Sequence, residues 1–167
     1  MQSKTQKIVA AAMFASLACV ATMILRIPSP LGGFINLGDC IVLLCGWLLS
    51  PLYGLLAAGI GSALADIFSG YVFYAPATFV IKALMALVAG KTAAALSKKT
   101  KPLFSNILSG LLAECIMLSG YYVFEGFVYG FAPSLVNIPA NAIQGAVGLV
   151  LGCILVQFFK NNKILHK

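Results

Sequence analysis

The long apolar runs of this 167-residue chain, which carry few charges, are the feature that most limits how it can fold. A helix rises about 1.5 Å per residue, so about 20 apolar residues cross a hydrocarbon core of about 30 Å, whereas barrel strands would alternate over roughly ten residues. The runs are of helical length. We therefore predict an all-α integral membrane protein, a single six-transmembrane-helix bundle over residues 1–167, with helices at about 8–25, 37–49, 52–68, 77–96, 104–123 and 138–159.

The composition excludes a soluble globule. Hydrophobic residues make up 61% of the chain and charged residues 9%, whereas soluble domains have about 45–50% and about 25%. So few charges cannot cover a water-facing surface. Polar tracts, a Gly-X-Y period and charged heptads are also missing, which excludes disorder, collagen and coiled coil.

The basic residues lie at the ends of the apolar runs, although the formal net charge of +7 could suggest a nucleic-acid partner. Under the six-helix division, lysines flank one set of helix ends, and Arg26 lies on the opposite side. By the positive-inside rule, this bias places both termini in the cytoplasm. We therefore expect a multi-pass protein of the cell membrane, surrounded by lipid and without a nucleic-acid partner. The flanking lysines are Lys4, Lys7, Lys98, Lys99, Lys101, Lys160, Lys163 and Lys167.

Four charged residues fall within predicted spans, where each costs roughly 2.5–3.5 kcal/mol on insertion scales and so needs a partner or a function. They are Asp39, Asp66, Lys82 and Glu114. Asp66 and Lys82 flank one short outer loop at similar depth, which predicts a structural ion pair between their two helices. Asp39 could instead cap its helix or share Lys82, and the sequence does not decide between these alternatives.

Three amide side chains recur on one face of the last predicted helix: Asn137, Asn141 and Gln144, at i, i+4 and i+7. Toward lipid they would be unsatisfied, so they should face the bundle. There they either form hydrogen bonds between helices or hold a small polar ligand. Glu114 could complete the same cavity or simply be paired.

Aromatic residues fill the predicted outer loops, among them Phe34, Tyr71, Tyr74, Tyr121 and Tyr129. Some of these would be ordinary interfacial anchors. The loop at 26–36 contains two prolines and two glycines, as a movable cover over a cavity would. Rings, amides and one or two charges together suit a flat heteroaromatic ligand.

Recognisable catalytic patterns are missing from the sequence. It has no phosphate-binding loop, no nucleophile beside a base and no metal-binding cluster, and its five cysteines are scattered without a CxxC pair. We therefore expect neither an enzyme nor a bound cofactor or metal. A row of small residues on the first helix, Ala11, Ala15 and Ala18, could instead dock a partner.

Several ordered segments resemble the substrate-binding S component of energy-coupling factor (ECF) vitamin transporters. The similarity is greatest to the branch for riboflavin and related pyrimidine or pyridoxine-type vitamins. It covers the first four predicted helices, and also Asn141 and Gln144 in the last. The segments are NLGD at 36–39, SPLYG at 50–54, GIGSALAD at 59–66, GY at 70–71, YAPAT at 74–78 and IKALM at 81–85.

The resemblance implies that a vitamin binds from outside under the loop at 26–36. It further implies that the alanine row docks onto a transmembrane T component driven by two ABC-type ATPase subunits, and that toppling of the S component carries the vitamin inward. An alternative is a self-contained secondary transporter or channel that uses Asp66, Lys82 and Glu114. The residues expected to bind the vitamin are Asn36, Asp39, Tyr74, Lys82, Glu114, Asn137, Asn141 and Gln144.

Overall fold

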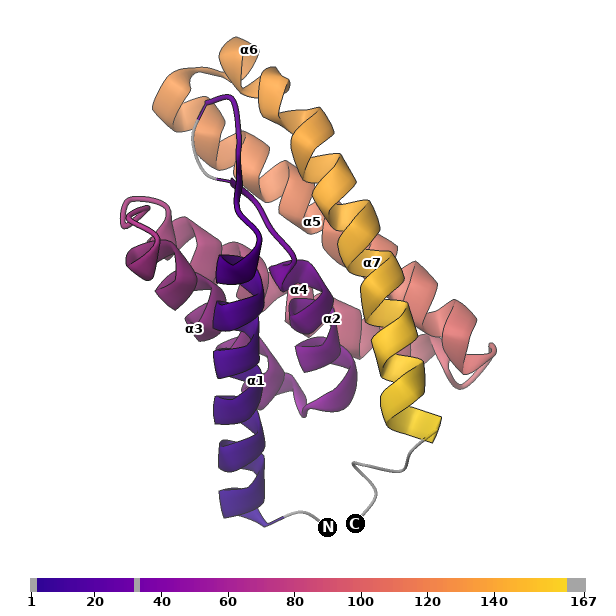
Figure 1. The fold of residues 1–167 in the computed structure, drawn as a ribbon. Coiled ribbons are helices and arrows are strands. Elements are labelled where there is room, and N and C mark those ends of the chain that lie inside the picture. Colours follow the sequence, from indigo (N-terminus) through magenta and orange to yellow (C-terminus); the bar gives the residue numbers. More distant parts are fainter. Residues whose placement is uncertain (1–2, 32–33, 162–167) are drawn as a thin grey trace.

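The computed structural model describes residues 3–31 and 34–161, and six long helices form most of this part of the chain (Figure 1). The predicted all-α bundle is confirmed. The long helices are α1 (Lys4–Ile24), α2 (Gly38–Leu48), α3 (Pro51–Phe68), α4 (Ala75–Leu96), α5 (Pro102–Tyr129) and α7 (Ile138–Asn161). The short elements are the strands β1 (Ile27–Pro28) and β2 (Phe34–Ile35), the helix α6 (Phe131–Ser134) and the 3₁₀ turn η1 (Leu135–Asn137).

Helix ends follow local sequence signals. Ser3 caps α1 in a capping box, in which the Gln6 backbone N–H donates to Ser3 Oγ at 3.2 Å and the Ser3 N–H donates to Gln6 Oε1 at 2.8 Å. Pro51 and Pro102 begin α3 and α5, where proline costs no helical hydrogen bond. Gly130, with a φ of 96°, ends α5. The fifth helix therefore continues six residues beyond the expected end at 123.

Five helical segments are long and apolar enough to cross a membrane: α1, α3, α4, α5 and the stretch Phe131–Phe159. The helix α2 has only 11 residues, which cover about half of a hydrocarbon core. Its residues 38–46 are buried, because α1, α3, α4 and α7 pack around it. The β1–β2 hairpin lies between α1 and α2 in the sequence and extends beyond both helices toward α6 (Figure 1).

Small residues bring the helices into close contact. A Cβ atom on Gly61 of α3 would lie 2.9 Å from the Cβ of Ala18 on α1, and one on Gly148 of α7 would lie 2.7 Å from the Cβ of Asp39 on α2. A Cβ atom on Gly90 of α4 would meet the backbone oxygen of Gly46 on α2, and one on Gly46 would meet the backbone oxygen of Ala86 on α4. In a membrane protein, such backbone approach provides much of the helix association.

The two ends of the bundle differ. The helix α1 begins and α7 ends at one end, while the hairpin and α6 lie at the other (Figure 1). This arrangement fits the predicted topology, in which both termini share one side. Of the lysines used for the prediction, Lys163 and Lys167 lie outside the described residues, as do Gly32 and Gly33 of the hairpin loop.

Candidate functional site

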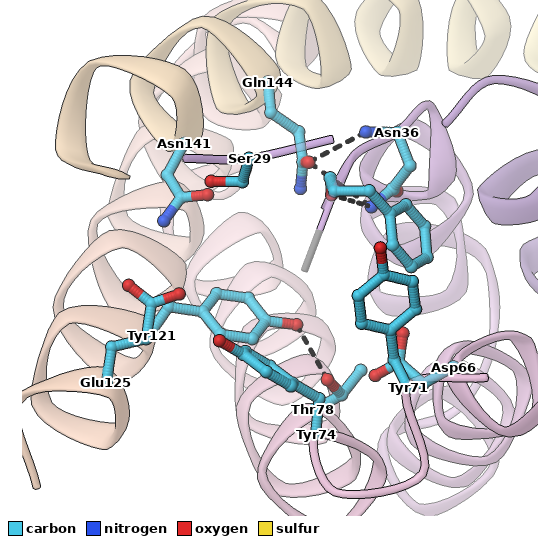
Figure 2. Close-up of a pocket in the computed structure, with 11 residues that line it drawn as sticks. Ser29, Asn36, Asp66, Tyr71, Tyr74, Thr78, Tyr121, Glu125, Asn141 and Gln144 are labelled. Atoms are coloured by element: carbon cyan, nitrogen blue, oxygen red, sulfur yellow. Dashed lines mark hydrogen bonds between the residues drawn. The ribbon is translucent and has the colours of Figure 1, made fainter. Parts of the chain in front are cut away.

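A pocket lies beneath the hairpin, between the helices that face it (Figure 2). The space between its lining side chains, including the open space at its mouth, is about 410 Å³. The hairpin, α3, the α3–α4 loop, α4, α5 and α7 all contribute side chains. The lining residues are Ser29, Phe34, Asn36, Asp66, Tyr71, Tyr74, Thr78, Tyr121, Glu125, Asn141 and Gln144.

The hairpin is held over the pocket by amide side chains from η1 and α7. Its strands pair Ile27 with Ile35 and Pro28 with Phe34. Ser29 Oγ donates to Asn137 Oδ1 at 2.6 Å, and the Asn36 backbone N–H donates to Gln144 Oε1 at 2.9 Å. These two amides join the hairpin to η1 and α7.

A buried ion pair lies below the pocket. Lys82 Nζ binds Asp39 Oδ1, and the two side chains are 3% and 0% exposed. The other Asp39 oxygen, Oδ2, accepts from Gln144 Nε2 at 2.7 Å. One carboxylate oxygen of Asp39 thus compensates the charge of Lys82. The other holds the Gln144 amide with its oxygen toward the hairpin.

The predicted ion pair between Asp66 and Lys82 is therefore wrong, since Lys82 pairs with Asp39. The reason is the central position of α2, which places Asp39 between α4 and α7. Asp66 instead lines the pocket from α3. Of the alternatives left open by the sequence, the structure favours the one in which Asp39 engages Lys82.

Aromatic rings form one wall of the pocket. The ring centroids of Phe34 and Tyr71 are 5.0 Å apart, and those of Tyr71 and Tyr74 are 6.3 Å apart in an edge-to-face arrangement. The hydroxyls of Thr78 and Tyr121 are hydrogen-bonded at 3.0 Å. This cluster of rings offers flat apolar surface to a planar ligand.

Three polar side chains of the pocket keep free hydrogen-bonding atoms within the described part of the chain. Glu125 Oε1 accepts from Asn137 Nδ2 at 2.9 Å, but Glu125 Oε2 has no hydrogen-bond partner. Asp66 Oδ2 is also buried without one. The Asn141 amide lies beside the Glu125 carboxylate in the view of Figure 2 and faces the cavity. Such unsatisfied groups are the expected contact points of an absent polar ligand.

The structure divides the eight predicted binding residues into two groups. Asn36, Tyr74, Asn141 and Gln144 line the pocket. The other four are not among the lining residues. Asp39 and Lys82 form the ion pair. Asn137 binds Ser29 of the hairpin and Glu125, and Glu114 lines a different groove.

Glu114 lines a separate, mostly apolar groove between α5 and α7, which has a volume of about 530 Å³. Its carboxylate lies against Gly145 of α7, where an added Cβ would be 2.9 Å from Oε2. Both Glu114 oxygens are without a hydrogen-bond partner. Only Asn141 lines both this groove and the pocket, so the expected single cavity containing Glu114 is not what the structure shows.

Sequence reasoning did not select Ser29, Thr78 or Glu125, and it gave Tyr121 only a general role in an aromatic wall. Glu125 was missed because the fifth helix was expected to end at 123, which left this carboxylate in an outer loop. Its spacing of four residues from Tyr121 places both on one helix face and could have revealed it.

The alanine row on α1 is also divided. Ala11 and Ala15 line an apolar groove between α1 and α3, together with Tyr53 and Leu56. Ala18 is 0% exposed, because it packs against Gly61 of α3. Ala18 is therefore unavailable for docking, contrary to the prediction.

Comparisons with known proteins agree with one another. The family described as ECF-type riboflavin transporter, S component, matches residues 2–161. A protein of Pyrococcus woesei, named only as an uncharacterized protein in the gap 3' region, is 32% identical over 134 residues, which cover 80% of this chain and 87% of that one. The thiamine precursor transporter HmpT of Lactococcus lactis is 24% identical over 140 residues, covering 84% and 78%.

A solved structure shares the fold. It is described as the S component of a bacterial ECF transporter and superimposes with a TM-score of 0.71 at 22% sequence identity. The match covers 95% of this chain and 98% of that one. The arrangement of six long helices is therefore that of a solved S component.

Proposed function

Because this chain belongs to the family of S components of ECF-type riboflavin transporters, a multi-pass membrane family of transporter subunits and not of enzymes, we propose that it captures a small heteroaromatic vitamin for import. The candidates are riboflavin, a pyridoxine-type vitamin or a hydroxymethylpyrimidine-like thiamine precursor. The last is supported by the similarity to HmpT.

One observation carries the proposal. The pocket combines an aromatic wall with free amide and carboxylate groups, and it lies at the end of the bundle opposite to the start of α1 and the end of α7. In the predicted topology that end faces outward. A hairpin held by few hydrogen bonds covers it. These features suit capture of a planar polar solute from outside.

The proposed partners are a transmembrane T component and two ABC-type ATPase subunits. The sequence itself has no phosphate-binding loop to use ATP. The groove between α1 and α3, lined by Ala11 and Ala15, offers an apolar face on which another membrane helix can pack. Toppling of the loaded subunit against these partners would bring the pocket to the inner side.

The test is titration of the purified chain with the three candidate vitamins by calorimetry, in the wild type and in Asn141→Leu. The Asn141 amide has no hydrogen bond within the described chain, so the substitution should spare the fold. It should weaken binding by about 1–3 kcal/mol by leaving a polar group of the ligand unpaired.

Ile143→Ala is the matched control, because Ile143 is 61% exposed on the same helix. It should bind as the wild type does. Equal affinities for the wild type and Asn141→Leu would remove Asn141 from the site, and no binding of any vitamin would refute the proposed function.

A further inference from the structure

The charges buried in this protein are unbalanced. The sequence contains four acidic residues, and all four are buried: Asp39, Asp66, Glu114 and Glu125 are between 0% and 9% exposed. Lys82 is the one buried basic side chain among the described residues. It is paired with Asp39, so the remaining three carboxyl groups lack a cationic partner there.

Two of these three carboxyl groups line the pocket under the hairpin. Glu125 is 3% exposed and Asp66 is 6% exposed, and each has one oxygen atom that receives no hydrogen bond. A buried acceptor without a donor is costly, and a charged one more so. The pocket is therefore poised to accept hydrogen bonds from a ligand.

Several other polar groups of the pocket are engaged elsewhere and do not bind the two free carboxyl oxygens. The Ser29 hydroxyl donates to Asn137, those of Thr78 and Tyr121 bind each other, and Gln144 donates to Asp39. No lysine, arginine or histidine is among the described residues that line the cavity. An anionic ligand would meet two carboxyl groups and no compensating cation.

The position of the free groups adds a directional requirement. The Glu125 carboxylate from α5 and the Asn141 amide from α7 lie on the same side of the pocket (Figure 2). A carboxylate accepts hydrogen bonds, whereas an amide can both donate and accept. A ring edge that carries an exocyclic amino donor beside a ring nitrogen acceptor complements this pair, with the amino group on Glu125 and the ring nitrogen on Asn141.

We propose that the pocket selects a nitrogen heteroaromatic ring that bears an exocyclic amino group or a protonated ring nitrogen. Glu125 accepts the hydrogen bond from this group. Phosphorylated or carboxylated vitamins are disfavoured. This inference rests on the proposed function, because it assigns the class of the captured vitamin. It favours the pyrimidine-type candidates over riboflavin, whose ring system carries no exocyclic amino group.

The test compares two probes that differ by one amino group. They are 4-amino-5-hydroxymethyl-2-methylpyrimidine and 5-hydroxymethyl-2-methylpyrimidine, titrated into the purified chain by calorimetry. The wild type should bind the amino compound about 10–100-fold more tightly, as expected for a hydrogen bond to a charged group. In Glu125→Gln this ratio should fall to within about threefold, because the neutral amide is a weaker acceptor.

Glu125→Gln preserves an oxygen for the hydrogen bond from Asn137, so the variant should fold. Glu114→Gln is the matched control, since Glu114 is a buried carboxyl on the same helix that faces the other groove. It should keep the wild-type ratio. If Glu125→Gln does not fold, the wild-type ratio alone decides, because equal binding of the two probes overturns the inference.

The result can also separate this inference from the proposed function. Tight binding of riboflavin together with weak binding of the amino compound would overturn the inference and leave the capture of a vitamin intact. The failure of riboflavin, pyridoxine and both pyrimidines to bind the purified chain would refute the proposed function itself.

Discussion

At the scale of single residues, the site depends on one chain of contacts that begins in the core. Lys82 binds Asp39, Asp39 accepts from Gln144, and Gln144 accepts from the Asn36 backbone in the hairpin. The ion pair therefore does more than neutralise a buried charge, because it orients the amide that holds the cover. The sequence predicted a pair between Asp66 and Lys82 and left open whether Asp39 engages Lys82, since the pairing depends on which helix lies at the centre.

Asp39→Asn should destabilise the protein by about 3–5 kcal/mol, because it leaves the Lys82 ammonium buried without a counter-charge. The midpoint of unfolding in detergent, followed by circular dichroism, measures this loss. Asp39→Asn combined with Lys82→Met should recover most of the stability, since no charge then remains unpaired. A single variant as stable as the wild type would show that the pair is not needed for the fold.

At the scale of elements, the hairpin and α5 show what local sequence can and cannot predict. The six long helices were predictable, because hydropathy and the breakers Pro51 and Pro102 act locally. The end of α5 was not, because the helix continues through Gly126, a poor helix former, to Tyr129. With that error Glu125 was lost from the site. The common face of the amides at 137, 141 and 144 could be predicted, because helical geometry places residues spaced by three and four on one side.

Ser29→Ala should raise the rate of vitamin dissociation by about 3–10-fold, because it removes the hydrogen bond from the hairpin to Asn137 and makes opening easier. Stopped-flow displacement of bound vitamin measures this rate. The association rate should change little, since the open form is reached in both proteins. Ser16→Ala, on an exposed face of α1, is the control. An unchanged dissociation rate would mean that the hairpin does not limit release.

Ala15→Trp should abolish vitamin uptake by cells while the isolated chain binds vitamin as before. The bulky ring would fill the groove between α1 and α3, which shares no lining residue with the pocket. Val147→Trp, at a 42% exposed position on α7, should leave both uptake and binding intact. A parallel loss of binding in Ala15→Trp would contradict a docking role for this face.

At the scale of the whole molecule, the structure suits the proposed binding subunit better than an independent transporter. The pocket with its polar lining lies at the end that carries the hairpin, while small residues such as Gly46 and Gly90 pack α2 against α4. The residues that an independent carrier would need for an ion relay are separated, because Lys82 is paired with Asp39 and Glu114 faces a different groove from Asp66. This separation supports the proposal that partner subunits move the solute.

The central claim is that this chain holds a vitamin but does not transport it alone, and uptake of radiolabelled vitamin by vesicles that contain only this chain tests it most directly. With the chain alone, the vitamin held by the vesicles should saturate at one per chain and should not increase with time. Uptake should continue only when the T component, the ATPase subunits and ATP are added. Steady accumulation by vesicles with the chain alone would contradict it.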